Sequence, residues 1–386
     1  MSNFIETFKR GREGRNFGLT TGIKGLDKAI NGLQRKTSIG LAAAPKTGKT
    51  TLCDFSFVIH PYLQCLELGI LDKVEWIYFS YEIDRVSKEF KFAAFFMAHD
   101  HKVFNYKYKD RLYQMTDTYL KGQQLHENPD GSLEQIPVSD EHFEILKIIY
   151  AERIVPLFGE YSDQGILITH DEQGNALTPP KIHIIEEPEN PTGIYKYLLH
   201  HASTQGTFLH HNYWTTDDKG VKVERQRISG YIPNDPDKFT IVITDHIRKL
   251  GEERNFNMKQ KIDKYLEYST IIRNLCGWTF IHVIHSNRSL SNVDRLRMAG
   301  EMIFPTADDC KDSGNPAEEC TIFMTLFNPG DEKYNLKKHM GVSLAEYPNY
   351  RSIHITESRN TKCPVHIQTN MYGGISTFTP LFSNQT

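Results

Sequence analysis

The feature that most constrains the fold is the stretch Ser38–Leu52, which has the sequence SIGLAAAPKTGKTTL. An apolar run ends in small residues, and a turn containing Gly48 leads directly into a helix start. Backbone N–H groups of such a turn, together with the positive end of the helix, form a cradle for phosphate groups. The stretch therefore predicts a phosphate-binding loop between a buried strand and a helix.

The residues expected to contact a nucleotide follow from the pattern G-x-x-x-x-G-K-[ST], in which Ala43 here replaces the first glycine. Lys49 is expected to reach the β- and γ-phosphates, and the Thr50 hydroxyl is expected to hold Mg²⁺. The other predicted contacts belong to the loop and its first helical turn, namely Ala43, Pro45, Lys46, Thr47, Gly48 and Thr51. The expected cofactors are ATP and Mg²⁺.

Two acidic residues follow predicted core strands. Glu82 comes just after the aromatic-rich run Val74–Ser80, and Asp245 ends the apolar run Phe239–Asp245. In α/β sheets the carboxyl ends of the strands form the ligand-binding edge. Glu82 is thus a candidate base for the attacking water, or alternatively an acid at the start of the next helix. Asp245 is expected to hold the Mg²⁺ water shell opposite Thr50.

Basic and imidazole groups follow the next strand, Trp278–Ile284. His285 ends it and is a candidate sensor of the γ-phosphate; the alternative is a strand-end histidine bonded to backbone. The segment Arg288–Thr306 lacks clear periodicity and is expected to be a flexible basic loop. Such a loop either touches a phosphate backbone or carries solvated charge. Its candidate DNA contacts are Arg288, Arg295 and Arg297.

Composition excludes several classes of protein. The 386 residues carry a formal charge of −3, so any nucleic-acid surface must be local. The six cysteines include no C-x-x-C pair, which argues against a disulfide framework and a structural zinc site. The N-terminus is too polar for a signal peptide, and no apolar run is long enough to cross a membrane. We therefore expect a cytoplasmic protein without membrane contact.

Strands and helices alternate through most of the chain, which predicts an α/β fold with a mostly parallel sheet. Residues 1–18 are expected to form a linker or arm, and residues 19–386 a single domain ending in a β-hairpin around Gly373-Gly374. An enlarged α+β insertion is expected at about residues 100–235. Turn-rich stretches there predict exposed hairpins. The last one, near Arg225 and Arg227, is either a solvated hairpin or a contact for a partner or DNA.

Taken in order, these signals resemble the motor domain of DnaB-like hexameric replicative helicases, which have a RecA-like P-loop ATPase fold. The resemblance covers about residues 19–90 and 239–380. It is carried by the segments Thr21–Asp27 (T-G-x-x-x-L-D in the family), Ala43–Thr50 (the phosphate loop), Phe79–Ile83 (F-S-L-E-M), Val242–Asp245 (V-I-D), Ser286–Leu290 (S-Q-L-N-R-S-L) and Ser358–Asn360 (Q-R-N-G).

The resemblance implies that Glu82 is the catalytic base and that Arg359 is an arginine finger reaching the nucleotide of a neighbouring subunit. It also implies a hexameric ring on single-stranded DNA and contacts with other replication proteins. The chain departs from the family at Glu357, where a lysine is usual, and at Thr361, where a glycine is usual. It also lacks the primase-binding N-terminal domain, which suggests a phage or mobile-element protein acting in a host cytoplasm.

The expected function is therefore an ATP-dependent helicase motor that translocates on single-stranded DNA. The alternative is a RecA-type ATPase that serves as a recombination mediator, or as a loader or regulator of a helicase, without unwinding DNA. The altered Glu357 and the long middle segment favour that alternative. A binding protein with a decayed nucleotide site is disfavoured by the intact set Lys49, Thr50, Glu82, Asp245 and Arg359.

Overall fold

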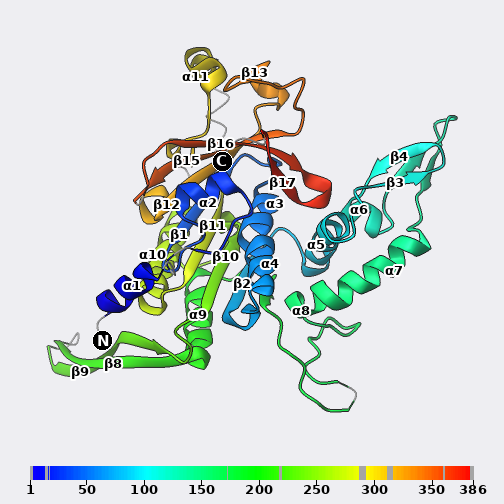
Figure 1. The fold of residues 1–386 in the computed structure, drawn as a ribbon. Helices are drawn as coiled ribbons and strands as arrows, with labels where there is room; N and C mark the ends of the chain where they lie inside the picture. The colour runs from blue at the N-terminus through cyan, green and yellow to red at the C-terminus, as the bar shows by residue number, and fades with distance from the viewer. Residues whose placement is uncertain are drawn as a thin grey trace.

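A nine-stranded sheet, in the order β17-β16-β15-β12-β1-β11-β10-β2-β7, is the centre of the computed structural model (Figure 1). The structure describes residues 3–13, 16, 18–171, 173–216, 220–286, 293–310, 316–359 and 361–382. The sheet strands are β1 (Ser38–Ala43), β2 (Val74–Ser80), β7 (Ile182–Ile185), β10 (Phe239–Asp245), β11 (Thr279–His285), β12 (Ile322–Phe327), β15 (Tyr350–Ser358), β16 (Val365–Tyr372) and β17 (Thr377–Pro380).

The strands from β12 to β7 pair in parallel, whereas β15, β16 and β17 are antiparallel and form one margin of the sheet. This arrangement confirms the predicted α/β class, the mostly parallel sheet and the C-terminal hairpin. The runs predicted for β2 and β10 match the observed strands end to end. Both are buried at every position, because helices cover the two faces of the sheet.

Helices divide between the two faces. One face packs against α2 (Lys24–Ile30), the helical run α3 (Lys49–Asp54) to α4 (His60–Glu67), and α5 (Arg85–His99). The other face packs against α9 (Pro191–Gln205) and α10 (Met258–Cys276). A π-helical turn, Phe55–Ile59, joins α3 to α4. Among the described residues, no helix is both long enough and apolar enough to cross a lipid bilayer.

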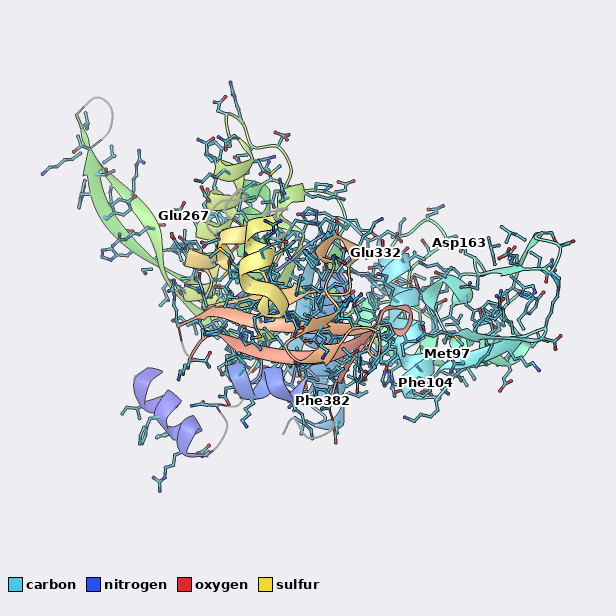
Figure 2. The ribbon with its side chains drawn as sticks, turned by 90° about the horizontal axis from the view of Figure 1, so that it is seen from above. Met97, Phe104, Asp163, Glu267, Glu332 and Phe382 are labelled. Carbon is cyan, nitrogen blue, oxygen red and sulfur yellow. The ribbon has the colours of Figure 1, made fainter. Side chains whose placement is uncertain are left out.

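Two extra segments flank β7 and α9. The first forms a lobe beside α5 that lies on the opposite side of the body from the second, as Asp163 and Phe104 mark in Figure 2. Its elements are β3 (Asn105–Tyr108), β4 (Arg111–Gln114), α6 (Asp117–Leu120), β5 (Leu125–Glu127), β6 (Leu133–Gln135), α7 (Asp140–Ile149) and α8 (Val155–Phe158). The second segment is a long hairpin of β8 (Gly206–Thr216) and β9 (Lys222–Pro233). Since β7 pairs with β2, it belongs to the central sheet.

The remaining elements lie at the margins. They are α1 (Asn3–Arg12), α11 (Val293–Ala299), α12 (Pro316–Glu319) and the small pair β13 (Lys338–His339) and β14 (Val342–Ser343). Helix α11 falls inside the segment expected to be a basic loop, so that part of the expectation was wrong. Contacts between Arg295 and the residues that follow the helix hold this segment, and sequence periodicity does not reveal them.

A buried ion pair supports the helix that follows the loop. The Lys88 ammonium on α5 lies 3.0 and 3.1 Å from the two carboxylate oxygens of Asp54, and both side chains are almost fully buried. The Tyr78 hydroxyl donates to the same carboxylate at 2.9 Å. Removing one partner of such a pair leaves the other charge buried and uncompensated.

We expect Lys88→Ala to lower the free energy of unfolding by about 3–5 kcal/mol, measured by denaturant unfolding. The control is Lys147→Ala, which breaks a solvent-exposed pair with Glu144 at 2.7 Å. That change is expected to cost at most about 1 kcal/mol, because solvent screens exposed pairs. Equal losses in the two variants would contradict the role given to burial.

Candidate nucleotide site

The loop after β1 adopts the backbone that its sequence predicts. Gly48 has φ +105° at the cap of α3, and Lys46 has φ +61°. A side chain at Gly48 would be strained by this φ, and its Cβ would lie 2.3 Å from the Met371 sulfur. Glycine at this position therefore lets the chain turn sharply into the helix beginning at Lys49. Free N–H groups at this turn and helix start are suited to an anion.

Thr50 and Asp245 meet at the carboxyl edge of the sheet. The Thr50 hydroxyl donates to Asp245 Oδ2 at 2.7 Å. Among the described residues, the other oxygen of this buried carboxylate, Oδ1, has no hydrogen-bond partner. Burial raises the pKa of Asp245, although Lys88 and the Thr50 hydrogen bond act to lower it. An unpartnered buried carboxylate oxygen beside a hydroxyl is a fitting ligand pair for Mg²⁺, as expected for these two residues.

Lys49 lies between the loop and the catalytic candidates. Its ammonium is 3.2 Å from the Ala44 carbonyl oxygen and 3.4 Å from His285 Nδ1. Burial lowers the pKa of Lys49, and the charges of Asp245 and Glu82 oppose that shift. The ammonium is thus held in a buried position without a carboxylate in direct contact among the described residues, which leaves it available to an anionic ligand.

Glu82 is held by two histidines. Its Oε1 lies 3.1 Å from His246 Nε2 and 3.6 Å from His285 Nε2, and the two imidazole rings pack edge to face with centroids 4.1 Å apart. Burial lowers the pKa of His246 to about 3 and that of His285 to about 4, so both rings are neutral near pH 7. The three groups place a carboxylate, a lysine and two neutral imidazoles at one edge, a set that suits general-base chemistry on water.

His246 was missed by sequence reasoning. It directly follows Asp245, so its position after a predicted strand was a usable signal, but nothing in the pattern shows where its ring points. Arg351 was also missed. It is the second residue of β15, and its Nε donates to the Thr47 carbonyl oxygen of the loop at 3.4 Å. This contact crosses the sheet from a residue far away in sequence, and no local motif signals it.

A second group of potential metal ligands comprises Glu75, His183 and His201. Glu75 already accepts from Lys238 at 2.7 Å and from Thr240 at 2.8 Å. Burial acts to raise the pKa of Glu75, but His201 and Lys238 hold it at about 2. The nearby ammonium repels a cation, so this group is best described as a buried ion-pair network.

Arg359 lies at the opposite edge of the sheet from the loop. It follows Ser358, which pairs with Ile322, and Ile322 in turn pairs with Ile39 at the start of β1. A strand rises about 3.3 Å per residue, so the length of β1 separates Arg359 from the loop by roughly 20 Å. Its exposed guanidinium donates to the Glu318 carbonyl oxygen at 2.8 Å. Arg359 and Lys49 therefore do not share a site within one chain.

The three predicted DNA contacts have different surroundings. Arg295 pairs with the buried carboxylate of Asp309 and donates to the Phe304 carbonyl oxygen at 3.0 Å, so in this conformation it braces its own segment. Arg297 is exposed on α11. Arg288 lies outside the described residues.

Two solved structures share this fold across nearly the whole chain. The first, the ATPase domain of G40P, has a TM-score of 0.60 and 13% identity, and the match covers 98% of this chain and 97% of that one. The second is a DnaB-like replicative helicase described with its primase interactions; it has a TM-score of 0.61 and 13% identity, with 99% and 68% covered. The chain has the fold of DnaB-like helicase ATPase domains. No protein-family model and no curated protein matches its sequence.

The position of Asp245 generates a stability prediction. Because burial raises its pKa, its stabilising contribution is present below the unfolded pKa and is lost as pH rises through the folded pKa. The ionised carboxylate therefore destabilises the empty site at pH 7. We expect Asp245→Asn to raise the free energy of unfolding by about 1 kcal/mol, as substitutions that relieve site strain do.

This measurement uses denaturant unfolding at pH 7 without Mg²⁺ or nucleotide. Asp163→Asn, at an exposed lobe position, is the control and is expected to change stability by less than about 0.5 kcal/mol. A clear loss of stability in Asp245→Asn would show that the carboxylate is satisfied in the empty site.

Proposed function

We propose that this chain is an ATP-dependent, DnaB-like helicase motor that translocates on single-stranded DNA as a hexameric ring, the assembly that its resemblance to DnaB-like helicases implies. The observation that carries the proposal is the division of the site. Lys49, Thr50, Glu82, Asp245 and His285 meet at one edge of the sheet, whereas Arg359 lies at the other. A neighbouring copy is then needed to complete the site.

The residues divide the chemistry as follows. Lys49 and the loop bind the phosphates of ATP, and Thr50 with Asp245 would hold Mg²⁺, which neutralises phosphate charge when bound. Glu82 orients or deprotonates the attacking water. His285 contacts both Lys49 and Glu82, so movement of Lys49 toward a phosphate changes the contacts of the base. Arg359 of the next subunit stabilises the charge that develops in the transition state.

The DNA contacts of the proposed motor are Arg288, Arg295 and Arg297, which follow the strand that carries His285. Contacts of this kind are made mainly to the DNA backbone and tolerate any sequence. Other replication proteins are proposed as partners, and the cytoplasm, of a host if the protein is phage-encoded, as the compartment.

Two observations favour a second function, a RecA-type ATPase that acts as a recombination mediator or as a helicase loader or regulator. Arg295 is engaged by Asp309, and Glu357 stands where the helicase family has a lysine. Both features reduce the basic charge offered to DNA or to a neighbouring nucleotide. A fork-unwinding assay separates the two functions, because only the helicase separates the strands.

We expect Glu82→Gln to lower ATP turnover by about 10²–10⁴-fold while ATP still binds, because the amide retains the shape of the side chain but cannot accept a proton. Turnover is measured by phosphate release and binding by a fluorescent ATP analogue. Glu267→Gln, an exposed change on α10, is the control and should turn over ATP at the wild-type rate. Wild-type turnover in Glu82→Gln would remove Glu82 from the role of base.

Mixing two inactive variants tests the shared site. Lys49→Ala and Arg359→Ala are each expected to be strongly impaired, the arginine change by about 10³–10⁵-fold. In randomly mixed rings about a quarter of the interfaces join an intact loop to an intact finger, so ATP turnover should return in part. Native mass measurements establish that rings form and mix. Mixed rings without recovered turnover would place Arg359 outside the site.

A further inference from the structure

The hairpin of β8 and β9, here called the β8–β9 arm, projects from the body in both views (Figures 1 and 2). Its strands have 11 and 12 residues, which gives a reach of roughly 35 Å at about 3.3 Å per residue. Phe208 and Tyr231 pack against the core cluster at its root, and the Tyr231 hydroxyl donates to the Ala202 carbonyl oxygen at 3.0 Å. Beyond the root the strands are largely exposed.

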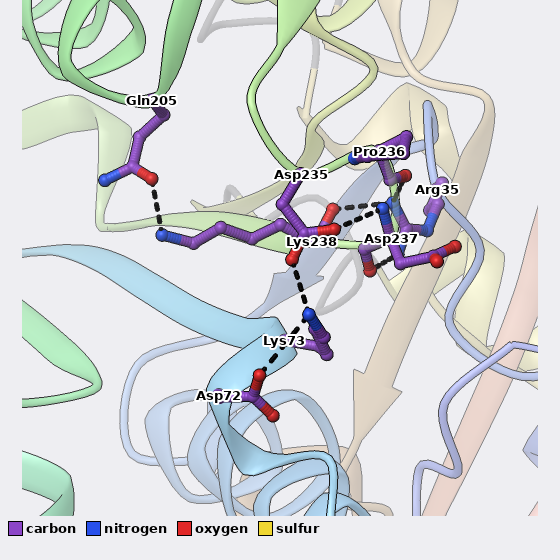
Figure 3. A network of polar contacts seen from close by, with 8 residues as sticks. All are labelled: Arg35, Asp72, Lys73, Gln205, Asp235, Pro236, Asp237 and Lys238. Atoms are coloured by element: carbon purple, nitrogen blue, oxygen red, sulfur yellow. Dashed lines mark hydrogen bonds and ion pairs between the residues drawn. The ribbon is translucent and has the colours of Figure 1, made fainter.

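The root is fixed on both sides by polar contacts (Figure 3). Lys238 donates to Gln205 at the end of α9 at 2.8 Å, and Lys73 pairs with Asp235 at 2.8 Å. Arg35 donates to three successive carbonyl oxygens of the segment between β9 and β10, those of Pro236, Asp237 and Lys238. The arm is thus held at a fixed angle to the sheet by contacts from three other parts of the chain.

The two faces of the arm differ in charge. Paired residues of a hairpin share a face, and successive residues alternate between faces. Tyr213 pairs with Arg225 and His211 with Arg227, so these four residues form one face, here called the basic face. The Arg227 guanidinium lies over the Tyr213 ring, 5.5 Å from its centre. Glu224 pairs with Trp214 and belongs to the other face.

The charge of the basic face is opposite in sign to the net charge of the protein. The protein carries a formal charge of −3, yet this face holds two exposed arginines and no acidic residue. Among the described residues, neither guanidinium has an ion-pair partner. Arginines beside an aromatic ring are the usual combination for a nucleic-acid backbone and its bases. A two-stranded ribbon alone is only marginally stable in water, which favours an arm that is supported by a partner.

We propose that the basic face of the β8–β9 arm binds the phosphate backbone of a nucleic acid. The arm leaves the body at the edge of the sheet where β10 begins, whereas α11 follows the carboxyl end of β11 at the opposite edge. It therefore forms a second nucleic-acid contact, separate from Arg295 and Arg297. The proposal extends the proposed function to a second DNA segment, but the contact itself needs neither ATP nor hydrolysis.

The test compares two double variants of the full chain that lose the same charge. Arg225→Gln/Arg227→Gln alters the basic face, and Arg254→Gln/Lys259→Gln alters two exposed positions, one just before α10 and one in its first turn. Affinity for a fluorescently labelled single strand and for the matching duplex is measured by anisotropy, without nucleotide, over a series of KCl concentrations. The first variant is expected to reduce the salt slope by about 1.4 for the single strand or about 1.8 for the duplex, and to weaken binding at least roughly tenfold.

The control variant is expected to keep the wild-type slope, and Arg225→Lys/Arg227→Lys should largely restore it because it keeps both charges. Whichever DNA form shows the change is the one that the arm contacts. Equal effects of the two charge-matched variants, or none in either DNA form, would overturn the proposal. So would a change in the native mass of the oligomer with unchanged DNA affinity, since the arm would then contact another subunit.

The assay also separates this proposal from the proposed function. ATP turnover without DNA should be equal in wild type and both double variants, because within the described part of the chain none of the altered residues contacts Lys49 or Glu82. If the wild-type chain hydrolyses no ATP but the basic face contributes to DNA affinity, the proposed motor function is wrong and the proposed DNA contact of the arm is supported. If ATP turnover is normal and the salt slope of Arg225→Gln/Arg227→Gln equals that of wild type, the proposed DNA contact of the arm is wrong and the proposed motor function is unaffected.

Discussion

The candidate site depends on the parallel pairing of β1, β11, β10 and β2. Ala43 pairs with His285, Asp245 pairs with Ser80, and Thr244 pairs with His282, so the four strands end within a few residues of one another at the same edge. Glu82 follows Ser80 by two residues and thereby comes within reach of His246 and His285. A slip of one residue in any pairing would turn these side chains to the other face of the sheet. The register is fixed because strands such as β2 and β10 are buried on both faces, so that every side chain has a defined packing position.

This dependence explains which parts of the site the sequence predicts. Residues that end predicted strands, such as Glu82, Asp245 and His285, could be brought together from their positions alone, because parallel strands share an edge. The loop was predicted because its turn needs glycine at Gly48. Strand ends and turns are local features, and local features are what a single sequence reports well.

Features that depend on distant partners could not be predicted. The role of Arg295 depends on Asp309, and that of Arg351 on Thr47 across the sheet. The place of β7 beside β2 was equally hidden, since about a hundred residues separate the two strands in sequence. The orientation of the His246 ring depends on the backbone path after Asp245. In each case the contact depends on tertiary packing, and the periodicity of apolar residues in the sequence does not indicate it.

Electrostatics connects the core to the site. The Lys88 ammonium pairs with Asp54, and its charge also acts to lower the pKa of Asp245, while Asp54 acts to raise it. Helix α5 thus supplies a cation, Lys88, that balances the buried carboxylates of Asp54 and Asp245 near the loop. The negative charges of Asp245 and Glu82 likewise favour the protonated form of Lys49 and act to raise its pKa. The side chains of the site form a network whose charges nearly balance, so an added anion or cation changes the interactions of several residues together.

The two edges of the sheet divide the proposed functions. One edge holds the loop, the base and the segment with Arg297, while the other holds Arg359 and the root of the β8–β9 arm. If Arg359 completes a neighbour's site, one edge of each subunit faces the opposite edge of the next, which is a head-to-tail interface that closes into a ring. The root of the arm lies at the same edge of the sheet as Arg359, so in such a ring both belong to the edge that faces the neighbouring nucleotide.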